Sequence, residues 1–440
     1  MTPSAEPHDA PPTSLYAKTL TLLKRLYESQ FIRHASLSLL LNSLSKVLAF
    51  FASAFAAKCM GALNYGISGV AHTAALQISV LYQLGLDTVA TRRIAANKYA
   101  DSTRALVETI ITLRVCLASA MMLIWDVAVW FMVDEPRRTA WWLASLILWL
   151  NASFLHFVFM GIEKMPVLNG IQALATTLSA IGIFLIFKPG APAGLDLAFT
   201  SASTAVVVAL SWLAYWREFG RAPISLALFR TPRALLPELL SESWKYFLMA
   251  LVTGLFTFFQ VPIVEMLSNT REAGIYRTAF SLILGLDFFL QSFYLLLLPR
   301  VVVWKEQGLE VLLQQQRRAL WLFGAVSTPI ALLAWFASPV FYDVFLGPEF
   351  AVGAEAFRIL AIARLTGFIA QVYVQTLVAM KRDIDFLIIS IIGSATSIGL
   401  SIVFIPNLGA LGAAWSAATG EVLINIASVI WVNMFQRNVR

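Results

Sequence analysis

Residues 139–160 read TAWWLASLILWLNASFLHFVFM, a stretch without Asp, Glu, Lys or Arg. A helix of about 20 mostly apolar residues is long enough to cross the roughly 30 Å hydrocarbon core of a bilayer. In that environment only helices and closed barrels satisfy every backbone polar group. The stretch therefore predicts a transmembrane helix.

Similar apolar stretches lie on both sides of it. The composition agrees, because 59% of the residues are hydrophobic and only 13% are charged, unlike a soluble globular domain. We predict an all-α polytopic membrane protein with twelve transmembrane helices, at approximately 36–58, 66–86, 106–130, 139–160, 166–187, 196–216, 245–267, 274–297, 319–342, 356–380, 385–405 and 410–433.

The basic residues gather in alternate connections between these spans. Lys and Arg are retained on the cytoplasmic side of a membrane, so the pattern predicts that both termini are cytoplasmic. This explains the net charge of +7 without a nucleic-acid-binding domain, for which the sequence shows no basic face. The predicted inner connections contain Arg92, Arg93, Lys98 and Arg104, then Arg217, Arg221, Arg230 and Arg233, then Arg300, Lys305, Arg317 and Arg318, then Lys381 and Arg382.

An internal repeat divides the spans into two groups of six. Gly66 follows the first span as Gly274 follows the seventh, and Arg92 matches Arg300 at the same offset of 208. Six spans return the chain to its starting side, which predicts two six-helix bundles related by a pseudo-two-fold along the membrane normal, with a cavity between them. The predicted units are a cytoplasmic tail that forms either an interfacial helix or a frayed extension (1–35), an N-terminal bundle (36–216), a cytoplasmic linker (217–244), a C-terminal bundle (245–433) and a cytoplasmic tail (434–440).

Several charged residues fall within or near the spans. A charge at the centre of a span costs about 2.5–3.5 kcal/mol on insertion scales, so such residues usually face a cavity or a partner. More bases than acids occur here, which favours a basic cavity; the alternative is that each base pairs with an acid to hold helices together. The bases include Lys46, Arg114, Arg277 and Arg364, and the acids include Glu265 and Asp287. Neither Cys59 nor Cys116 has metal-ligand or disulfide spacing, so we expect no metal site and no disulfide.

Four segments carry a family resemblance: KCMGALNYGI at 58–67, LGLD at 84–87, RRIA at 92–95 and AGIYRTA at 273–279, with Pro299 after the last. They resemble the O-antigen repeat-unit flippases, polysaccharide-biosynthesis membrane proteins of the multidrug/oligosaccharidyl-lipid/polysaccharide exporter superfamily. The likeness covers essentially residues 36–433. It implies that two bundles rock about a basic cavity and move an undecaprenyl-diphosphate-linked oligosaccharide from the inner to the outer leaflet of the bacterial cytoplasmic membrane.

The resemblance also suggests roles for particular residues. Bases in a partly dehydrated cavity can pair with diphosphate oxygens while the lipid tail stays in the bilayer. The expected substrate contacts are Lys46, Arg114, Arg277 and Arg364 with Gln260 and Gln371, and the candidates for coupling to H⁺ or Na⁺ are Asp287, Glu265 and His72. Gln260 departs from the family pattern, because many members carry a carboxylate at that place in span 7.

Two other functions remain open. An ion-coupled multidrug exporter of the same superfamily would use a cavity dominated by carboxylates, and an integral glycan polymerase or ligase would need a larger outer loop than the roughly 15 residues predicted here. No nucleotide-binding Gly-rich motif is present, so we expect no ATPase domain and no cofactor. We expect a non-enzymatic flippase whose partners are a lipid-linked oligosaccharide and membrane lipids. It would be a monomer and could associate with a glycan polymerase and glycosyltransferases.

Overall fold

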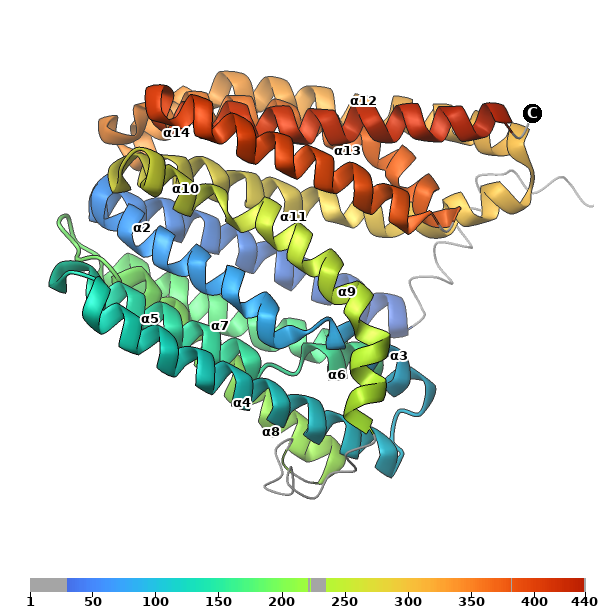
Figure 1. Cartoon of the computed structure of the whole chain (residues 1–440), viewed down its shortest axis with the longest axis horizontal. Coiled ribbons are helices and arrows are strands. Elements are labelled where there is room, and N and C mark those ends of the chain that lie inside the picture. The colour runs from blue at the N-terminus through green and yellow to red at the C-terminus, as the bar shows by residue number, and fades with distance from the viewer. Residues whose placement is uncertain (1–29, 221, 223–234, 381, 439–440) are drawn as a thin grey trace, which may run out of the picture.

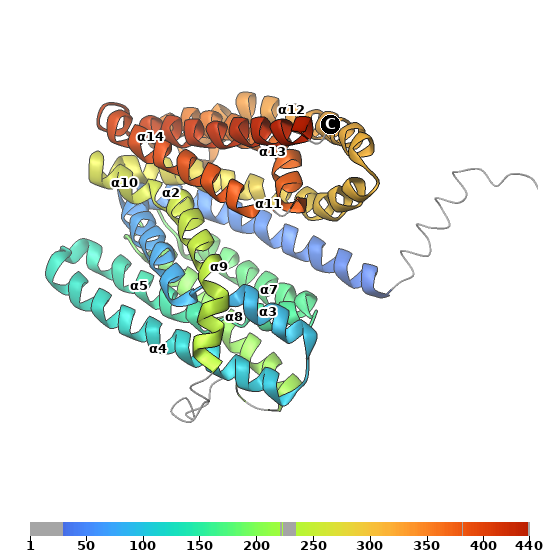
Figure 2. The same ribbon diagram turned by 45° about the vertical axis from the view of Figure 1, so that its right-hand side comes forward.

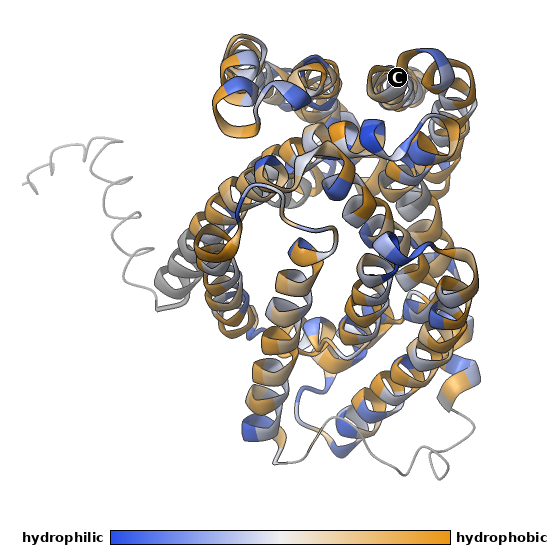
Figure 3. Cartoon of the chain, turned by 90° about the vertical axis from the view of Figure 1, so that its left-hand side faces the viewer, coloured by the Kyte–Doolittle hydropathy of each residue, from blue (hydrophilic) through white to orange (hydrophobic). Residues whose placement is uncertain are grey.

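The computed structural model describes residues 30–220, 222, 235–380 and 382–438. Every regular element within these ranges is a helix, and most are long and lie roughly along one direction (Figure 1). Apolar residues cover the lengths of the helices, while hydrophilic residues gather at their ends and in the connections (Figure 3). Most of the predicted interfacial helix in the tail lies outside the described residues.

The N-terminal half occupies the lower part of Figure 1 and the C-terminal half the upper part. The N-terminal half contains α2 (Gln30–Gln83), α3 (Leu86–Ala96), α4 (Asp101–Met132), α5 (Glu135–Ala152), α6 (His156–Gly161), α7 (Met165–Ile186) and α8 (Leu195–Phe219). The C-terminal half contains α9 (Leu235–Phe258), α10 (Gln260–Leu267), α11 (Thr270–Glu306), α12 (Leu309–Phe341), the π-helical turn η2 (Tyr342–Leu346), the 3₁₀ turn η3 (Pro348–Phe350), α13 (Ala351–Ala379) and α14 (Asp383–Asn438).

The helices fit a multi-pass membrane protein. Among the described residues, 8 stretches are long and apolar enough to cross a membrane. Two of them, Leu44–Gln83 and Ile384–Gln436, each hold two helices that meet at a glycine with positive φ, Gly61 or Gly409. Helices α9 to α11, some of whose side chains lie outside the described set, are long enough to add two further passages. The arrangement is consistent with the twelve predicted spans.

Several span ends differ from those predicted. Spans 1 and 2, and spans 11 and 12, are joined by a single glycine rather than a loop, because glycine adopts positive φ without a steric penalty. The fourth predicted span is interrupted between α5 and α6, where Trp212 Nε1 donates to the Ser153 carbonyl at 2.8 Å. Helix α9 starts at Leu235, inside the predicted linker.

The two ends of the bundle can be distinguished by their connections. We call the end where Gly61, Gly194 and Gly409 turn the chain the turn end, and the opposite end, where α8 ends at Phe219 and α9 begins at Leu235, the linker end. The predicted topology would make the turn end extracytoplasmic. Helix α9 starts at the linker end and packs against α2 and α3 of the other half, crossing between the halves in both views (Figures 1 and 2).

The halves meet through a symmetric glycine contact between α2 and α11. A Cβ on Gly66 would lie 2.0 Å from the Thr270 carbonyl oxygen, and a Cβ on Gly274 would lie 1.9 Å from the Ala62 carbonyl oxygen. Residues 62 and 270 differ by the same 208 positions as the two glycines, so each half makes the same contact to the other. Only residues without a side chain allow the two backbones to approach this closely.

The same offset relates two contacts that hold connections at the turn end. Asn64 Nδ2 donates to the Ala191 carbonyl at 3.1 Å, between α7 and α8. Glu272 Oε2 accepts from the Ala410 amide at 2.9 Å, within the turn of α14. Residues 64 and 272 are 208 positions apart. The internal repeat in the sequence therefore corresponds to a pseudo-two-fold in the structure.

Candidate functional site: a cavity between the two halves

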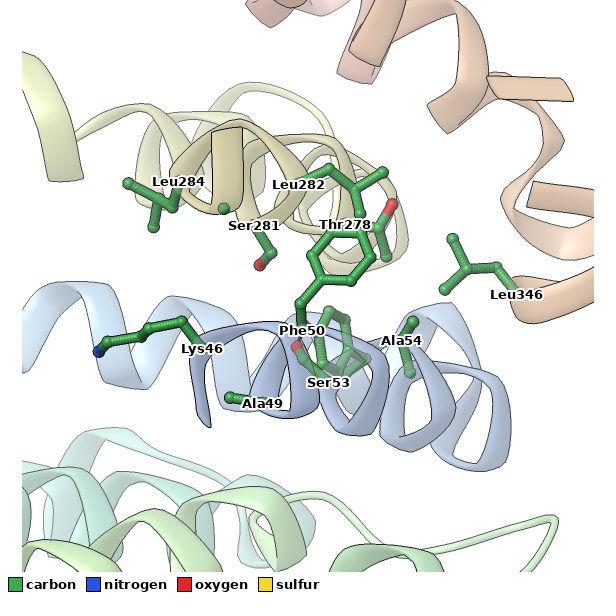
Figure 4. Close-up of a pocket in the computed structure, with 13 residues that line it drawn as sticks. Lys46, Ala49, Phe50, Ser53, Ala54, Thr278, Ser281, Leu282, Leu284 and Leu346 are labelled. Carbon is green, nitrogen blue, oxygen red and sulfur yellow. Dashed lines mark hydrogen bonds between the residues drawn. The ribbon is translucent and has the colours of Figure 1, made fainter. Parts of the chain in front are cut away.

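Two adjoining cavities lie where the halves meet. One of about 340 Å³ is enclosed by α2, α7 and α8 on one side and by α9 and α11 on the other. A second of about 280 Å³ lies between α2 and α11 (Figure 4). They share lining residues, including Ser53, Tyr65 and Ser281, so we treat them as one site and call it the central cavity. Its position between the halves agrees with the predicted location.

Arg277 of α11 joins the halves in this cavity. Its Nη1 donates to the Tyr65 carbonyl at 2.7 Å, its Nη2 pairs with Asp196 Oδ2 at 3.0 Å, and its guanidinium carbon lies 3.9 Å from the centre of the Tyr65 ring. Gly69 makes room for the side chain, because a Cβ there would lie 2.3 Å from Arg277 Cδ. The planar guanidinium can satisfy all three contacts at once, which an ammonium cannot.

Asp196, in the first turn of α8, is a charged cavity residue that sequence reasoning missed. It is 7% exposed, and its Oδ1 has no hydrogen-bond partner among the described residues. It is the only charged residue in the predicted span 196–216. That signal was available, but at the edge of a span an acid is usually solvated. The structure instead places it inside the cavity, opposite Arg277.

Two other predicted residues line the central cavity. His72 of α2 faces the part between α2, α7 and α8. Lys46, also of α2, lies at one end of the part between α2 and α11, with Leu346 at the other end (Figure 4). The charged lining residues are thus two bases, Lys46 and Arg277, and one acid, Asp196, if His72 is neutral. This leaves one positive charge in excess.

Two of the four bases predicted to contact substrate, Arg114 and Arg364, do not line the central cavity. Arg114 lines neither part of it: its Nη2 pairs with Asp87 Oδ1 at 2.7 Å, and its guanidinium lies over the Phe157 ring. Arg364 lies within the C-terminal half, where it pairs with Asp287 at 3.1 Å and Glu421 at 3.2 Å. A lone charge at membrane depth is costly, so these bases have acid partners on other helices.

The remaining predicted residues also lie outside the central cavity. Gln260 donates to Ser397 Oγ at 2.8 Å and accepts from Ser401 Oγ at 3.2 Å, which joins α10 to α14. Gln371 accepts from Gln375 Nε2 at 3.4 Å on α13. Glu265 pairs with Arg137 at 3.1 Å across the halves at the turn end. The contacts of Gln260 and Glu265 hold different helices together, whereas the contact of Gln371 lies within α13.

A small cavity in the C-terminal half adjoins the Arg364 cluster. It has a volume of about 40 Å³ and is lined by Gln260, Tyr276, Arg364 and Glu421, among others. Among the described residues, no group of three or more His, Cys, Asp and Glu side chains is placed to hold a metal ion, and Cys59 and Cys116 are both free thiols.

Comparisons with known proteins agree with this architecture. The solved structure of the lipid II flippase MurJ in an inward closed conformation superposes with a TM-score of 0.72 at 13% identity, covering 90% of this chain and 87% of that one. An inward-facing multidrug resistance MATE family transporter of the MOP superfamily superposes with a TM-score of 0.66 at 15% identity, covering 89% of this chain and 95% of that one. A MOP superfamily transporter from Pyrococcus furiosus superposes with a TM-score of 0.53 at 17% identity, covering 92% of this chain and 95% of that one.

These low identities show a shared fold. No curated protein sequence matches the chain. A family model described as polysaccharide biosynthesis protein matches residues 31–303, which is more than half of the chain and includes α2 to α10 with most of α11. The chain therefore belongs to the polysaccharide biosynthesis protein family.

Proposed function

We propose that the protein is a flippase that moves an oligosaccharide linked to a polyprenyl diphosphate, such as undecaprenyl diphosphate, from the inner to the outer leaflet of the bacterial cytoplasmic membrane. The observation that carries this proposal is the central cavity between two six-span halves, with Arg277 at their junction. Membership of the polysaccharide biosynthesis family and the fold shared with a lipid II flippase support it.

The chemistry of the cavity suits a diphosphate head group. A diphosphate with attached sugars cannot cross hydrocarbon unaided, and guanidinium and ammonium groups form strong charge-assisted hydrogen bonds with phosphate oxygens. Arg277 and Lys46 provide one of each in adjoining parts of the cavity. To bind phosphate, Arg277 would give up its hydrogen bond to Asp196 or to the Tyr65 carbonyl and donate to a phosphate oxygen instead. Substrate binding would then weaken a contact that holds the halves together.

Contacts at the turn end would have to separate for release to the outer leaflet. Lys58 Nζ donates to the Val344 carbonyl at 2.8 Å, and Arg137 pairs with Glu265 at 3.1 Å. Both contacts join the N-terminal half to the C-terminal half, and both involve partly exposed side chains, so each contributes only about 0–1 kcal/mol. A bound substrate can therefore shift the balance between two arrangements of the halves.

Deleting the gene in its host tests the proposal. We expect the polyprenyl-diphosphate oligosaccharide to accumulate and the corresponding surface polysaccharide to be lost, because the lipid-linked unit stays in the inner leaflet. Mass spectrometry of lipid extracts, with a membrane-impermeant glycosidase to report the leaflet, measures both effects, and the wild-type gene should restore both. Sensitivity to lipophilic cations without accumulation would indicate a multidrug exporter instead, and accumulation in the outer leaflet would indicate a polymerase or ligase.

We further propose that Asp287 couples transport to a cation. Asp287 and Glu421 both pair with Arg364, so the cluster carries one excess negative charge when both acids are ionised. Binding a proton or Na⁺ would remove this charge, which is costly at membrane depth. The other coupling candidates differ in their setting: His72 lies in the central cavity, and Glu265 lies in the pair with Arg137.

The substitution Asp287→Asn neutralises the cluster while keeping the size of the side chain and the pair between Arg364 and Glu421. We expect normal membrane abundance, with transport that is lost or no longer responds to external pH. The measurement is transport into proteoliposomes over a range of pH at constant Na⁺, and then over a range of Na⁺ at constant pH. A wild-type response to both ions would make Asp287 only a structural partner of Arg364.

A further inference from the structure

The two walls of the central cavity differ in their chemistry. The C-terminal half provides Arg277 and the single hydroxyl of Ser281 together with the apolar side chains of Phe258, Phe280 and Leu284. The N-terminal half provides polar groups at helical spacing, so that they share one face of α8 and one face of α7. These groups are Asp196, Thr200, Ser203 and Thr204 on α8, and Thr176 and Ser179 on α7.

Hydrogen bonds within α8 leave two of its hydroxyls, those of Thr200 and Thr204, as acceptors toward the cavity. Thr200 Oγ1 donates to the Asp196 carbonyl at 2.8 Å, and Thr204 Oγ1 donates to the Thr200 carbonyl at 2.8 Å. Each hydroxyl has one proton, so both oxygens retain only acceptor capacity toward the cavity. On α7, Ser179 Oγ likewise donates to the Phe199 carbonyl at 3.5 Å. These three hydroxyls can therefore only accept hydrogen bonds from a ligand, which favours a ligand with donors.

The unpartnered oxygen of Asp196 is an independent indication of such a ligand. Oδ2 pairs with Arg277, but Oδ1 is buried without a donor among the described residues. A buried acceptor without a hydrogen bond is destabilising, so a bound donor would be favoured there. An ionised phosphate has only acceptors and would be repelled by the carboxylate. A sugar hydroxyl can donate, and the C–H faces of a sugar ring suit the phenyl rings of Phe258 and Phe280 on the opposite wall.

We propose that the face formed by α7 and α8 is a carbohydrate subsite, which we call the hydroxyl wall: Asp196, Thr200, Ser203 and Thr204 with Thr176 and Ser179. The sugars of the substrate lie between this wall and Phe258 and Phe280, and the diphosphate lies toward Arg277 and Lys46. The proposal rests on the proposed function, and it adds that the substrate binds in one orientation, with its glycan against the N-terminal half.

Binding to the purified full-length protein tests this assignment. The probes are the lipid-linked oligosaccharide extracted from the deletion strain and undecaprenyl diphosphate without sugar. The variants are Ser203→Ala with Thr204→Val on α8, and Thr176→Val with Ser179→Ala on α7. We expect the affinity for the oligosaccharide lipid to fall by roughly two- to tenfold for each hydrogen bond lost. The affinity for undecaprenyl diphosphate should not change, because it has no sugar.

Control variants separate this role from general damage. Ser201→Ala removes a hydroxyl on the same helix that donates to the Leu197 carbonyl and lies outside the cavity lining, so it should bind both lipids like the wild type. Thr204→Ser keeps the oxygen and should bind the oligosaccharide lipid more tightly than the variant with Ser203→Ala and Thr204→Val. Arg277→Gln should weaken binding of both lipids by the same factor, because the diphosphate is common to them.

The possible failures can be distinguished. If the wall variants bind both lipids as the wild type does, or lose affinity for both equally, the hydroxyl wall is not a carbohydrate subsite. Equal wild-type affinity for the two lipids would overturn the assignment in the same way. If no lipid-linked oligosaccharide accumulates in the deletion strain, the proposed flippase function itself is wrong, and the carbohydrate subsite is rejected with it.

Discussion

Replacing Arg277 by alanine is expected to abolish transport and to lower the amount of folded protein in the membrane. The substitution leaves Asp196 as a buried charge without its partner, and breaking a buried ion pair in this way costs about 3–5 kcal/mol. It also removes the guanidinium that contacts the Tyr65 carbonyl from the other half. Complementation of the deletion strain and the amount of protein in isolated membranes measure the two effects.

A second variant separates folding from function. Arg277→Ala combined with Asp196→Ala leaves no unpaired charge, so we expect abundance near the wild-type level while transport stays absent. Arg277→Lys should retain part of the activity, since one ammonium cannot hold both Asp196 and the Tyr65 carbonyl. Arg271→Ala, on the same helix in an exposed pair with Glu349, is the matched control and should change little. Transport by the double variant would show that Arg277 acts only as a structural residue.

Gly66→Ala and Gly274→Ala are expected to disrupt the junction between the halves. Each new Cβ would lie about 2 Å from a backbone carbonyl oxygen of the other half, far inside van der Waals contact. Backbone atoms cannot rotate away as a side chain can, so the halves would have to separate. Overpacking of this kind costs about 1–3 kcal/mol or more. We expect a lower melting temperature of the purified protein and loss of transport in both variants.

Gly324→Ala on α12 is the control for these variants. Nothing lies within 4 Å of its added Cβ, and alanine favours helix over glycine by about 1 kcal/mol, so stability should hold or rise. Because the two junction glycines are related by the repeat, they should have similar effects. If either junction variant melts and transports like Gly324→Ala, the close contact at this glycine is not needed.

Sequence patterns predicted the spans well because their cause is local. The length of an apolar run determines whether a helix can cross the bilayer, and that length can be counted in a single sequence. Turns made by one residue were not predicted: Gly61 and Gly409 reverse the chain by adopting positive φ, which leaves no loop composition to detect. The break between α5 and α6 was missed for a related reason, since Trp212 on α8 donates to the Ser153 carbonyl, which has no helical partner at the break.

The site was predicted only in part, because its pairing depends on distant segments. The bases were identifiable as charges in apolar stretches. Their partners come from other helices: Asp196 lies 81 positions from Arg277, and Asp87 lies 27 positions from Arg114. A single sequence contains no information on which acid meets which base. An unpaired basic cavity was therefore predicted where the structure has two bases, one acid and a wall of hydroxyl groups.

If the halves rock against each other as proposed, the contact between Gly66 and Gly274 limits how they can move. Two backbones already in contact cannot approach further, so one half would turn about this point as about a fulcrum. Lys46 lies on the part of α2 that extends away from this contact, separated from the Gly61 turn by roughly 22 Å of helix at 1.5 Å per residue. A small rotation at the glycines would thus displace Lys46 much further than Arg277, which lies close to the fulcrum.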